Sequence, residues 1–437
     1  MAQHIRIIRR AARRRGAVAV LVAALLTTLL GIMAIAVDGG LLLDNHRRVQ
    51  SAADAAALAA ATELFVHYPA VESTGVYDPG GAAAAAAVAS ASANGFPNDG
   101  GHATVTVNLP PQSGPFTGRP AYVEVIVTYY QPRYFSGIWG SASSPVVARS
   151  VARGRWASSN RGIVVLDPVA KDALNASGTG TVTVTGGAAV IVDSNDPVAG
   201  AATGGGMVTA PVFEITGGYT GNLVGEIHTG VPPTPDHLRY LPVPPVPPNG
   251  TIRSRPLGQG NKEYTLSPGR HTNLPNFNAG DVVILQQASA NGEGIYYIAG
   301  GGLKSTGASI VMDSGTSGGV MIYNDPASSA LSEQIQITGN SSGTVNLSGL
   351  TSGPYAGMLL WQRRSATQQL SVAGGGNFSL TGTFYAANAL LQVTGSGDAV
   401  IGSQYISRKL NLGGGGNTRI DYSDSGTARL REVVLVE

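Results

Sequence analysis

The sequence predicts a chain with an N-terminal transmembrane helix, a small α+β unit and a glycine-rich all-β region, which we expect to form a right-handed parallel β-helix. Three observations support this prediction. Residues 16–37 form one apolar run, and alanine-rich helical stretches and alternating strand patterns follow it as far as residue 157. Beyond that point the composition changes. The first 157 residues contain 15 glycines, whereas the remaining 280 contain 45, about twice the glycine content of an ordinary protein. The expected segments are therefore 1–15, 16–37, 38–157 and 158–437.

The composition is that of a chain able to bury a core, because 43% of its 437 residues are hydrophobic and only 12% are charged. Six of the 28 basic residues are arginines ahead of the apolar run, so the rest of the chain carries 22 basic residues against 26 acidic ones. A mildly acidic body gives no reason to expect a nucleic-acid partner, which requires a basic face. The absence of cysteine excludes disulfides, thiolate metal sites and cysteine nucleophiles.

The apolar run is long enough to cross a lipid bilayer. Residues 16–37 carry no charge, include eleven Leu, Ile or Val residues, and span about 33 Å as a helix. The arginines lie immediately before the run, so the positive-inside rule places residues 1–15 in the cytoplasm and everything after Asp38 outside it. We therefore expect a single-pass protein of the cell membrane, with the lipid bilayer as its first partner.

A cleaved signal peptide is the alternative for this segment. Ala34-Ile35-Ala36 has the small-x-small form that precedes a signal-peptidase site. The apolar run is longer than the usual apolar core of a signal peptide, which is about 7 to 15 residues. This length favours the membrane anchor.

The segment after the membrane predicts a small α+β unit. Residues 48–61 contain no glycine or proline and are strong helix formers, so the helix should continue until Pro69 ends it. A second alanine-rich stretch, residues 82–93, ends at Asn94-Gly95, a natural helix C-cap. Strand patterns then follow at residues 103–107, 122–130 and 145–151.

Residues 158–437 consist of short apolar strands separated by Gly, Ser, Thr, Asn and Asp. Residues 190–197 resemble residues 320–326, and each segment is followed by a glycine-rich turn and another strand. Short β units with small-residue turns and little charge are typical of a solenoid, in which stacked neighbours bury one another's faces. The repeat is imperfect, so a β-sandwich remains the alternative architecture.

One segment interrupts this pattern. Eight of the 18 residues from 231 to 248 are proline, which cannot pair inside a sheet and favours an extended polyproline II conformation. The segment is either a linker or a strap along the β-helix. The apolar residues Leu238, Tyr240 and Leu241 favour a packed strap.

The apolar run is followed in register by the string Gln50-Ser51-Ala52-Ala53-Asp54-Ala55-Ala56-Ala57-Leu58. This arrangement resembles the TadG-like N-terminal region of Flp (Tad, tight-adherence) pilus-assembly proteins. The resemblance implies a bacterial envelope protein that associates with Tad pilus and secretion machinery and serves adhesion or biofilm formation. It also implies a pilin-like unit in residues 38–157 and a β-helical ectodomain after it. The anchor and motif residues that show the resemblance are Arg14, Arg15, Gly16, Val37, Asp38, Gln50, Ala53, Asp54, Ala55, Ala56 and Leu58.

The sequence departs from this family at one position. Tad pilins carry a glutamate five residues after the processed glycine, and here that position after Gly16 is Leu21. The departure favours a static anchor over a processed, polymerising subunit.

No catalytic, cofactor or metal site is predicted. The seven histidines are scattered and none has the spacing of a zinc signature, and the glycine runs lack the Lys-Ser/Thr of a phosphate loop. Asp193, Asn195 and Asp196 could form a calcium site, although a turn held by side-chain-to-backbone hydrogen bonds is the simpler interpretation.

Two other functions are kept as alternatives. A polysaccharide-cleaving enzyme would need carboxylates and a basic residue brought together, and Asp313, Asp325, Arg363 and Arg364 are the candidates. An adhesin would present aromatic faces to surface glycans, although packing inside the rungs is the simpler expectation. The aromatic candidates are Tyr296, Tyr297, Tyr323, Trp361 and Tyr385.

Overall fold

The computed structural model describes residues 15–74, 78, 80–134, 143–157, 159–289, 292–314, 318–339, 343–375, 377–423 and 426–437. The chain divides into two compact units. The first, here called the α+β unit, comprises the residues up to Trp156 together with Arg431–Glu437. The second, here called the stacked β unit, comprises Ala157–Leu430.

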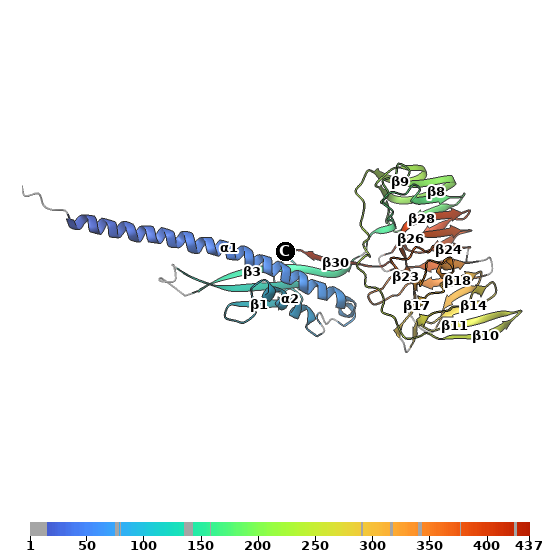
Figure 1. Ribbon diagram of the computed structural model, residues 1–437, viewed down its shortest axis with the longest axis horizontal. Helices are drawn as coiled ribbons and strands as arrows, with labels where there is room; N and C mark the ends of the chain where they lie inside the picture. The colour runs from blue at the N-terminus through green and yellow to red at the C-terminus, as the bar shows by residue number, and fades with distance from the viewer. Residues whose placement is uncertain are drawn as a thin grey trace, which may run out of the picture. The chain divides into compact units, whose positions relative to one another are not determined.

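The α+β unit begins with one long helix, α1 (Arg15–Thr74), followed by the short helix α2 (Ala82–Ala93) (Figure 1). Alanine, leucine and valine dominate α1, which explains its length. The prediction that Pro69 ends this helix is wrong, because α1 continues to Thr74. Proline removes one backbone hydrogen bond, but its fixed φ near −65° is itself helical. Both carboxylate oxygens of Asp78 accept backbone N–H groups at the start of α2.

A four-stranded sheet completes the α+β unit in the order β1-β2-β3-β30. Its strands are β1 (Ala103–Asn108), β2 (Tyr122–Pro132), β3 (Ser143–Ala157) and β30 (Leu430–Leu435). The pairs β1–β2 and β2–β3 are antiparallel, as the alternating sequence patterns predict. The two helices and the sheet share one apolar core built from small helical residues and strand valines.

The last strand corrects the expected boundary of the ectodomain. Residues 158–437 were expected to form one region, but residues 431–437 belong to the α+β unit because β30 joins its sheet beside β3. Glu432 fixes this strand through ion pairs to Arg153 and Arg155, the second with an N–O distance of 2.8 Å. In topology, the stacked β unit is therefore an insertion between two neighbouring strands of one sheet.

Most strands of the stacked β unit pair in parallel between successive coils of the chain, whereas the pairs β10–β11 and β15–β16 are antiparallel. Three parallel ladders run through it, and the long strands β8, β26 and β28 turn corners and so contribute to more than one ladder. The parallel pairing differs from the antiparallel sheets of the alternative β-sandwich. The right-handed winding remains a prediction. The strands are β4 (Arg161–Val165), β5 (Leu174–Ser177), β6 (Thr181–Val184), β7 (Ala189–Val192), β8 (Gly200–Ile215), β9 (Tyr219–Thr229), β10 (Ile252–Gly258), β11 (Asn261–Leu266), β12 (Gly269–His271), β13 (Phe277–Asn278), β14 (Val282–Leu285), β15 (Ala288–Ser289), β16 (Gly292–Glu293), β17 (Ile295–Ala299), β18 (Leu303–Thr306), β19 (Ser309–Met312), β20 (Met321–Asp325), β21 (Ile335–Thr338), β22 (Val345–Ser348), β23 (Met358–Gln362), β24 (Leu370–Gly374), β25 (Phe378–Thr381), β26 (Thr383–Gly395), β27 (Ala399–Ile401), β28 (Gln404–Gly414) and β29 (Thr418–Ile420), with a 3₁₀ turn at Leu331–Glu333.

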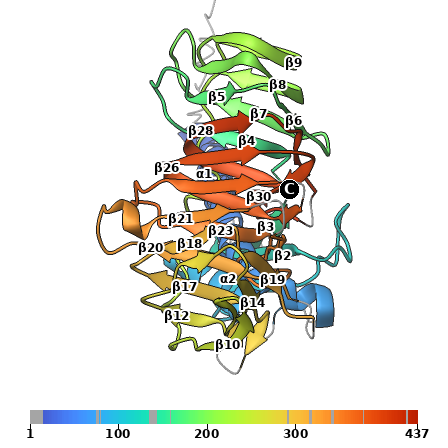
Figure 2. The ribbon, with the colours of Figure 1, turned by 90° about the vertical axis from the view of Figure 1, so that its right-hand side faces the viewer.

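The chain enters and leaves this stack in its middle. Strands β4 and β5 pair with β28, and β6 pairs with β29, so the first strands of the unit lie against its last ones. From there the chain builds coils out to β9 and then resumes at β10, and these two strands lie at opposite ends of the stack (Figures 1 and 2). It then winds back to the middle. Adjacent entry and exit points are what an inserted domain requires.

The two similar segments of the sequence, residues 190–197 and 320–326, lie at equivalent places in the stack. They include β7 and β20, which occupy the same ladder several coils apart. The interior of the coils is filled by aliphatic residues and a few aromatic rings. Glycine is required where corners of successive coils meet: at Gly221, with φ +85°, a Cβ atom would lie 1.7 Å from the carbonyl oxygen of Ala202.

Candidate functional site: the apolar helix and its docking surface

Apart from the buried Ala34, the N-terminal part of α1 presents its large apolar side chains to its surroundings. It belongs to the one helix among the described residues that is long and apolar enough to cross a membrane, Val18–Leu64. Water-soluble monomers rarely expose a continuous apolar surface of this size, so this part of the helix is a candidate membrane span. The predicted span of residues 16–37 lies almost wholly within this helix. The exposed large apolar residues are Val18, Val20, Leu21, Val22, Leu25, Leu26, Leu29, Leu30, Ile32, Met33, Ile35, Val37, Leu42 and Leu43.

Around Asp38 the helix begins to meet the sheet. A hollow of about 340 Å³ lies between α1 and the ends of β2 and β3, and Ile35, Asp38, Pro132 and Arg133 are among its lining residues. Of the motif residues before this point, Val37 is exposed, Arg15 and Gly16 begin the helix, and Arg14 lies outside the described residues.

The second part of α1 packs against the sheet and α2 through alanine. Two adjacent residues in each turn of the helix are buried, which gives a stripe made almost wholly of small side chains. Small residues let the helix backbone come close to its neighbours. The alanine string of the motif is therefore a packing face, of which Ala53 and Ala56 form part, while Ala55 and Leu58 lie half-buried at its edge. The buried residues are Val49, Ala52, Ala53, Ala56, Ala57, Ala60, Ala61 and Leu64.

The closest approach is at Gly154 of β3. A Cβ atom at this position would lie 1.9 Å from the carbonyl oxygen of Ala61. This contact is between two backbones, so no side chain can move aside to relieve it. Gly154 therefore fixes how near α1 lies to the sheet.

Gly154→Ala should destabilise the α+β unit by about 1 to 3 kcal/mol, because the helix must shift away from β3 and leave gaps along the alanine stripe. The measurement is urea unfolding of the full chain followed by helical circular dichroism. Gly101→Ala is the matched control, since the nearest atom to its Cβ is 4.0 Å away. Equal stability of the two variants would contradict this account of the stripe.

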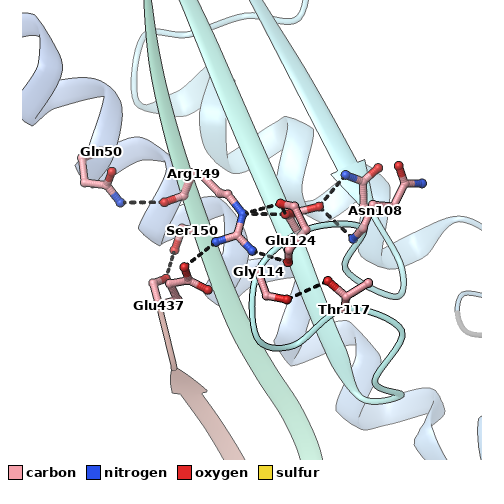
Figure 3. A network of polar contacts seen from close by, with 10 residues as sticks. Gln50, Asn108, Gly114, Thr117, Glu124, Arg149, Ser150 and Glu437 are labelled. Atoms are coloured by element: carbon pink, nitrogen blue, oxygen red, sulfur yellow. Dashed lines mark hydrogen bonds and ion pairs between the residues drawn. The ribbon is translucent and has the colours of Figure 1, made fainter.

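Two polar residues of the motif, Gln50 and Asp54, lie beside the alanine stripe, and Gln50 bonds the helix to the sheet. The side-chain amide of Gln50 donates to Asp54 at 2.8 Å and to the backbone carbonyl of Arg149 in β3 at 3.1 Å (Figure 3). The motif thus combines a packing stripe with a hydrogen bond to the sheet. Both features position α1 on β3.

Beside this bond lies a polar network around Glu124, which sequence analysis missed. Glu124 is buried in β2 and accepts hydrogen bonds from the side chains of Ser113 and Asn108 and from the backbone N–H of Gln112 at 3.0 Å (Figure 3). The guanidinium of Arg149 also forms an ion pair with Glu124, with an N–O distance of 2.5 Å. A lone carboxylate inside the apolar pattern of residues 122–130 was the available signal.

The network also reaches β30. Arg149 forms a 2.8 Å ion pair with Glu437, whose backbone carbonyl accepts the N–H of Val151 at 2.8 Å. Burial raises the pKa of Glu124, but the hydrogen bonds from Ser113, Asn108 and Arg149 outweigh burial and lower this pKa to about 2. The network therefore holds a charged carboxylate at the junction of β2, β3 and the returning strand.

Ionised Glu124 should stabilise the folded α+β unit by about 3 kcal/mol at pH 7. Its pKa is about 2 in the folded chain and 4.5 for an unperturbed glutamate, so this stabilisation is complete above about pH 4.5 and is lost as the pH falls toward 2. Urea unfolding of Glu124→Gln and the parent should therefore differ at pH 7 and converge near pH 2. Glu63→Gln on the half-exposed side of α1 is the control and should cost less than about 0.5 kcal/mol at pH 7. A gap between Glu124→Gln and the parent that does not change with pH would contradict the assignment.

In the stacked β unit, all five aromatic candidates for glycan binding are buried, which agrees with the simpler expectation of packing and not with the adhesin alternative for these residues. Tyr297, Tyr323, Trp361 and Tyr385 follow one another in register on four successive coils, with ring centroids 5.0 to 5.9 Å apart. They point out of the coils but lie under other segments, including Leu238 of the proline-rich strap and Tyr355. Tyr296 points inward and donates to the carbonyl of Leu266 at 2.8 Å.

Residues 231–248 form the predicted strap. Arg364 donates to the carbonyls of Leu238 and Leu241 at 2.6 and 2.7 Å, and its guanidinium lies 5.2 Å from the centre of the Trp361 ring. The hydroxyl of Tyr385 donates to Asp236 at 2.6 Å. Leu238 is buried and Leu241 half-buried, whereas Tyr240 is 76% exposed. Two of the three apolar residues thus pack as the sequence predicts.

The candidate enzymatic residues make structural contacts. Asp325 pairs with Arg363 at 2.6 Å and accepts the hydroxyl of Tyr297 at 2.6 Å. Asp313 accepts the backbone N–H of Gln287 at 2.9 Å, and Arg364 holds the strap. The carboxylates and arginines that the enzyme alternative needs in one place thus each have a different structural partner.

The candidate calcium residues form a turn and hold the strap. Asp193 accepts the backbone N–H of Thr234 at 2.7 Å, and Asp196 accepts that of Val198 at 2.8 Å. Within the part of the chain that the structure describes, no group of three or more His, Cys, Asp or Glu side chains could hold a metal ion. The geometry matches the simpler interpretation, a turn held by side-chain-to-backbone hydrogen bonds.

Comparison with known proteins locates the similarity in the segment where the helix changes from exposed to packed. The Tad family model, described as Flp pilus-assembly TadE/G-like, matches residues 16–63. No curated protein and no solved structure matched the chain.

Proposed function

Because residues 16–63 are a Tad-family, Flp pilus-assembly TadE/G-like module, we propose that the protein is a membrane-anchored structural component of a Tad-type pilus machine. In this proposal α1 crosses the membrane once, and the α+β unit and the stacked β unit lie outside the cytoplasm. The protein acts through contacts with pilus-assembly proteins and is not an enzyme. The stacked β unit is a right-handed parallel β-helix.

The division of α1 into two parts is the observation that supports this proposal most directly. The matched segment includes both the exposed apolar part and the alanine stripe docked on the sheet. The exposed apolar part is not expected in a soluble protein. The alanine stripe is not expected in a helix that serves only as a membrane tether. Together they suit a folded domain held rigidly at the end of its own membrane helix.

The orientation follows from the charges in the sequence. Six arginines precede the span and no acidic residue occurs before Asp38, so the positive-inside rule places the N-terminus in the cytoplasm. The insertion topology of the stacked β unit agrees with placing both units on the same side of the membrane. Its two chain connections both run to neighbouring strands of the α+β unit.

A complementation experiment tests the proposed function. In the bacterium that encodes the protein, loss of the gene should abolish pili counted by electron microscopy, and the full chain should restore them. Asp313→Asn and Asp325→Asn should also restore them, whereas deletion of residues 16–62 should not. Pili that persist without the gene but fail to attach would identify an adhesin instead. A purified polysaccharide-cleaving activity lost in the Asn variants would identify an enzyme.

A further inference from the structure

The second half of the strap, residues 242–248, has the sequence Pro-Val-Pro-Pro-Val-Pro-Pro. Proline fixes φ near −65°, and each residue that precedes a proline is restricted to extended conformations. Every residue of this segment meets one of these two conditions. None of the seven, all of them described, belongs to a strand. The segment is therefore a polyproline II helix with three residues per turn.

The burial of this segment repeats with the same period. Pro244 is buried and Pro247 half-buried, so these two residues face the coils. The other residues form two outward rows. One row consists of the exposed prolines Pro242, Pro245 and Pro248. The other consists of Val243, 49% exposed, and Val246, 61% exposed.

Both ends of the segment are fixed to the stack. Arg364 holds the carbonyl of Leu241 at one end, and at the other the backbone N–H of Arg270 donates to the carbonyl of Pro248 at 2.8 Å. The outward rows are thus presented on a rigid support. Little conformational entropy remains to be lost when a partner binds them.

A cation and an aromatic ring lie directly before these rows. Tyr240 is exposed, and the guanidinium of Arg239, also exposed, lies 4.5 Å from the centre of its ring. Polyproline II ligands present exposed prolines and apolar side chains to the grooves that bind them. The exposed prolines and valines of this segment, preceded by an aromatic residue and a positive charge, have that chemistry. Such grooves are lined with aromatic side chains, and an acidic rim would complement Arg239.

We propose that residues 239–248 are a docking surface for a partner protein whose domain has an aromatic-lined groove with an acidic rim. The partner contacts the row of Pro242, Pro245 and Pro248 and the row of Val243 and Val246. A groove that needed Leu241 or Pro244 could not reach them, because they face the coils. This inference depends on the stacked β unit alone and holds whether or not the protein is anchored in a membrane.

Site-specific photo-cross-linking tests this inference in cells that make the full chain. A benzoylphenylalanine at position 243 or 246 should cross-link to a single partner protein. The same group at Val169, which is 64% exposed and lies outside the strap, should not. The purified partner should then bind the purified chain and be displaced by a synthetic peptide of residues 239–248.

Two variants show whether binding uses the outward rows. Pro242→Ala combined with Pro245→Ala should weaken binding of the purified partner at least about tenfold, as should Val243→Glu combined with Val246→Glu. Both pairs change outward side chains only, so the thermal unfolding midpoint of the Val→Glu pair should stay that of the parent. The Pro→Ala pair should lower the midpoint modestly, because alanine gives the unfolded chain more conformational freedom. The inference is overturned if no adduct exceeds that at Val169, if adducts join only two copies of this chain, or if binding is insensitive to both pairs.

Discussion

Arginine at positions 25 and 29 should release the protein from carbonate-washed membranes. Both leucines are exposed on α1, by 60% and 57%, and lie one turn apart near the middle of the apolar run. Each Leu→Arg change costs about 3 to 4 kcal/mol on an insertion scale. Together they cancel or exceed the roughly 3 to 7 kcal/mol that the eleven Leu, Ile and Val residues contribute.

The measurement is the fraction of full-length chain in the membrane pellet after carbonate washing. Leu25→Phe combined with Leu29→Phe is the matched control and should remain in the pellet, because phenylalanine is as favourable as leucine in the bilayer. Neither pair touches the alanine stripe, so the α+β unit should fold in both cases. An arginine variant that remains in the pellet like the control would show that this helix does not hold the chain in the membrane.

Trp361→Ala should destabilise the stacked β unit by about 3 to 5 kcal/mol. Trp361 is fully buried and packs against the rings of Tyr323, Tyr355 and Tyr385, and these four residues with Tyr297 form an aromatic cluster on the outside of the coils. Its removal leaves a cavity and takes away the ring under the guanidinium of Arg364. Because Arg364 holds the strap, we also expect faster proteolysis within residues 236–248.

Urea unfolding and limited proteolysis of the full chain measure this effect. Tyr240→Ala, a loss of another aromatic ring but from an exposed position, is the control and should change stability by less than about 0.5 kcal/mol. Trp361→Phe should cost much less than Trp361→Ala, because the indole N–H has no hydrogen-bond partner among the described residues. If Trp361→Ala and Tyr240→Ala gave equal stability and equal proteolysis, the cluster would not be a core.

Features encoded locally in the sequence could be predicted. The apolar run, the alanine-rich helices, the first three strands of the α+β unit and the proline-rich strap each depend on the properties of neighbouring residues. The same holds for the change in architecture near residue 158, where glycine begins to supply the coil corners. Pro69 was a local signal that misled, because one missing hydrogen bond near the end of a long helix does not stop it.

Features that join distant parts of the chain could not be predicted. The return of β30 to the first sheet pairs residues nearly 300 positions apart, and no local pattern in residues 430–437 distinguishes it from another coil. The alternation of Tyr296 and Tyr297 shows that one ring faces inward and the other outward, but not that the strap covers the outward one. Likewise, Glu124 was visible as an unusual residue, whereas its partners on three other segments were not.

Single-cysteine labelling tests the central claim most directly, because the chain has no cysteine and so gives no background. Gln3→Cys and Val169→Cys place one thiol before the apolar run and one in the stacked β unit. Spheroplasts are treated with a membrane-impermeant maleimide, and the protein is then recovered from carbonate-washed membranes. We predict that only Val169→Cys is labelled in intact spheroplasts and that Gln3→Cys reacts only after lysis. Labelling of Gln3→Cys in intact spheroplasts, protection of Val169→Cys, or recovery of the chain in the soluble fraction would contradict a single-pass anchor that holds the β unit outside the cytoplasm.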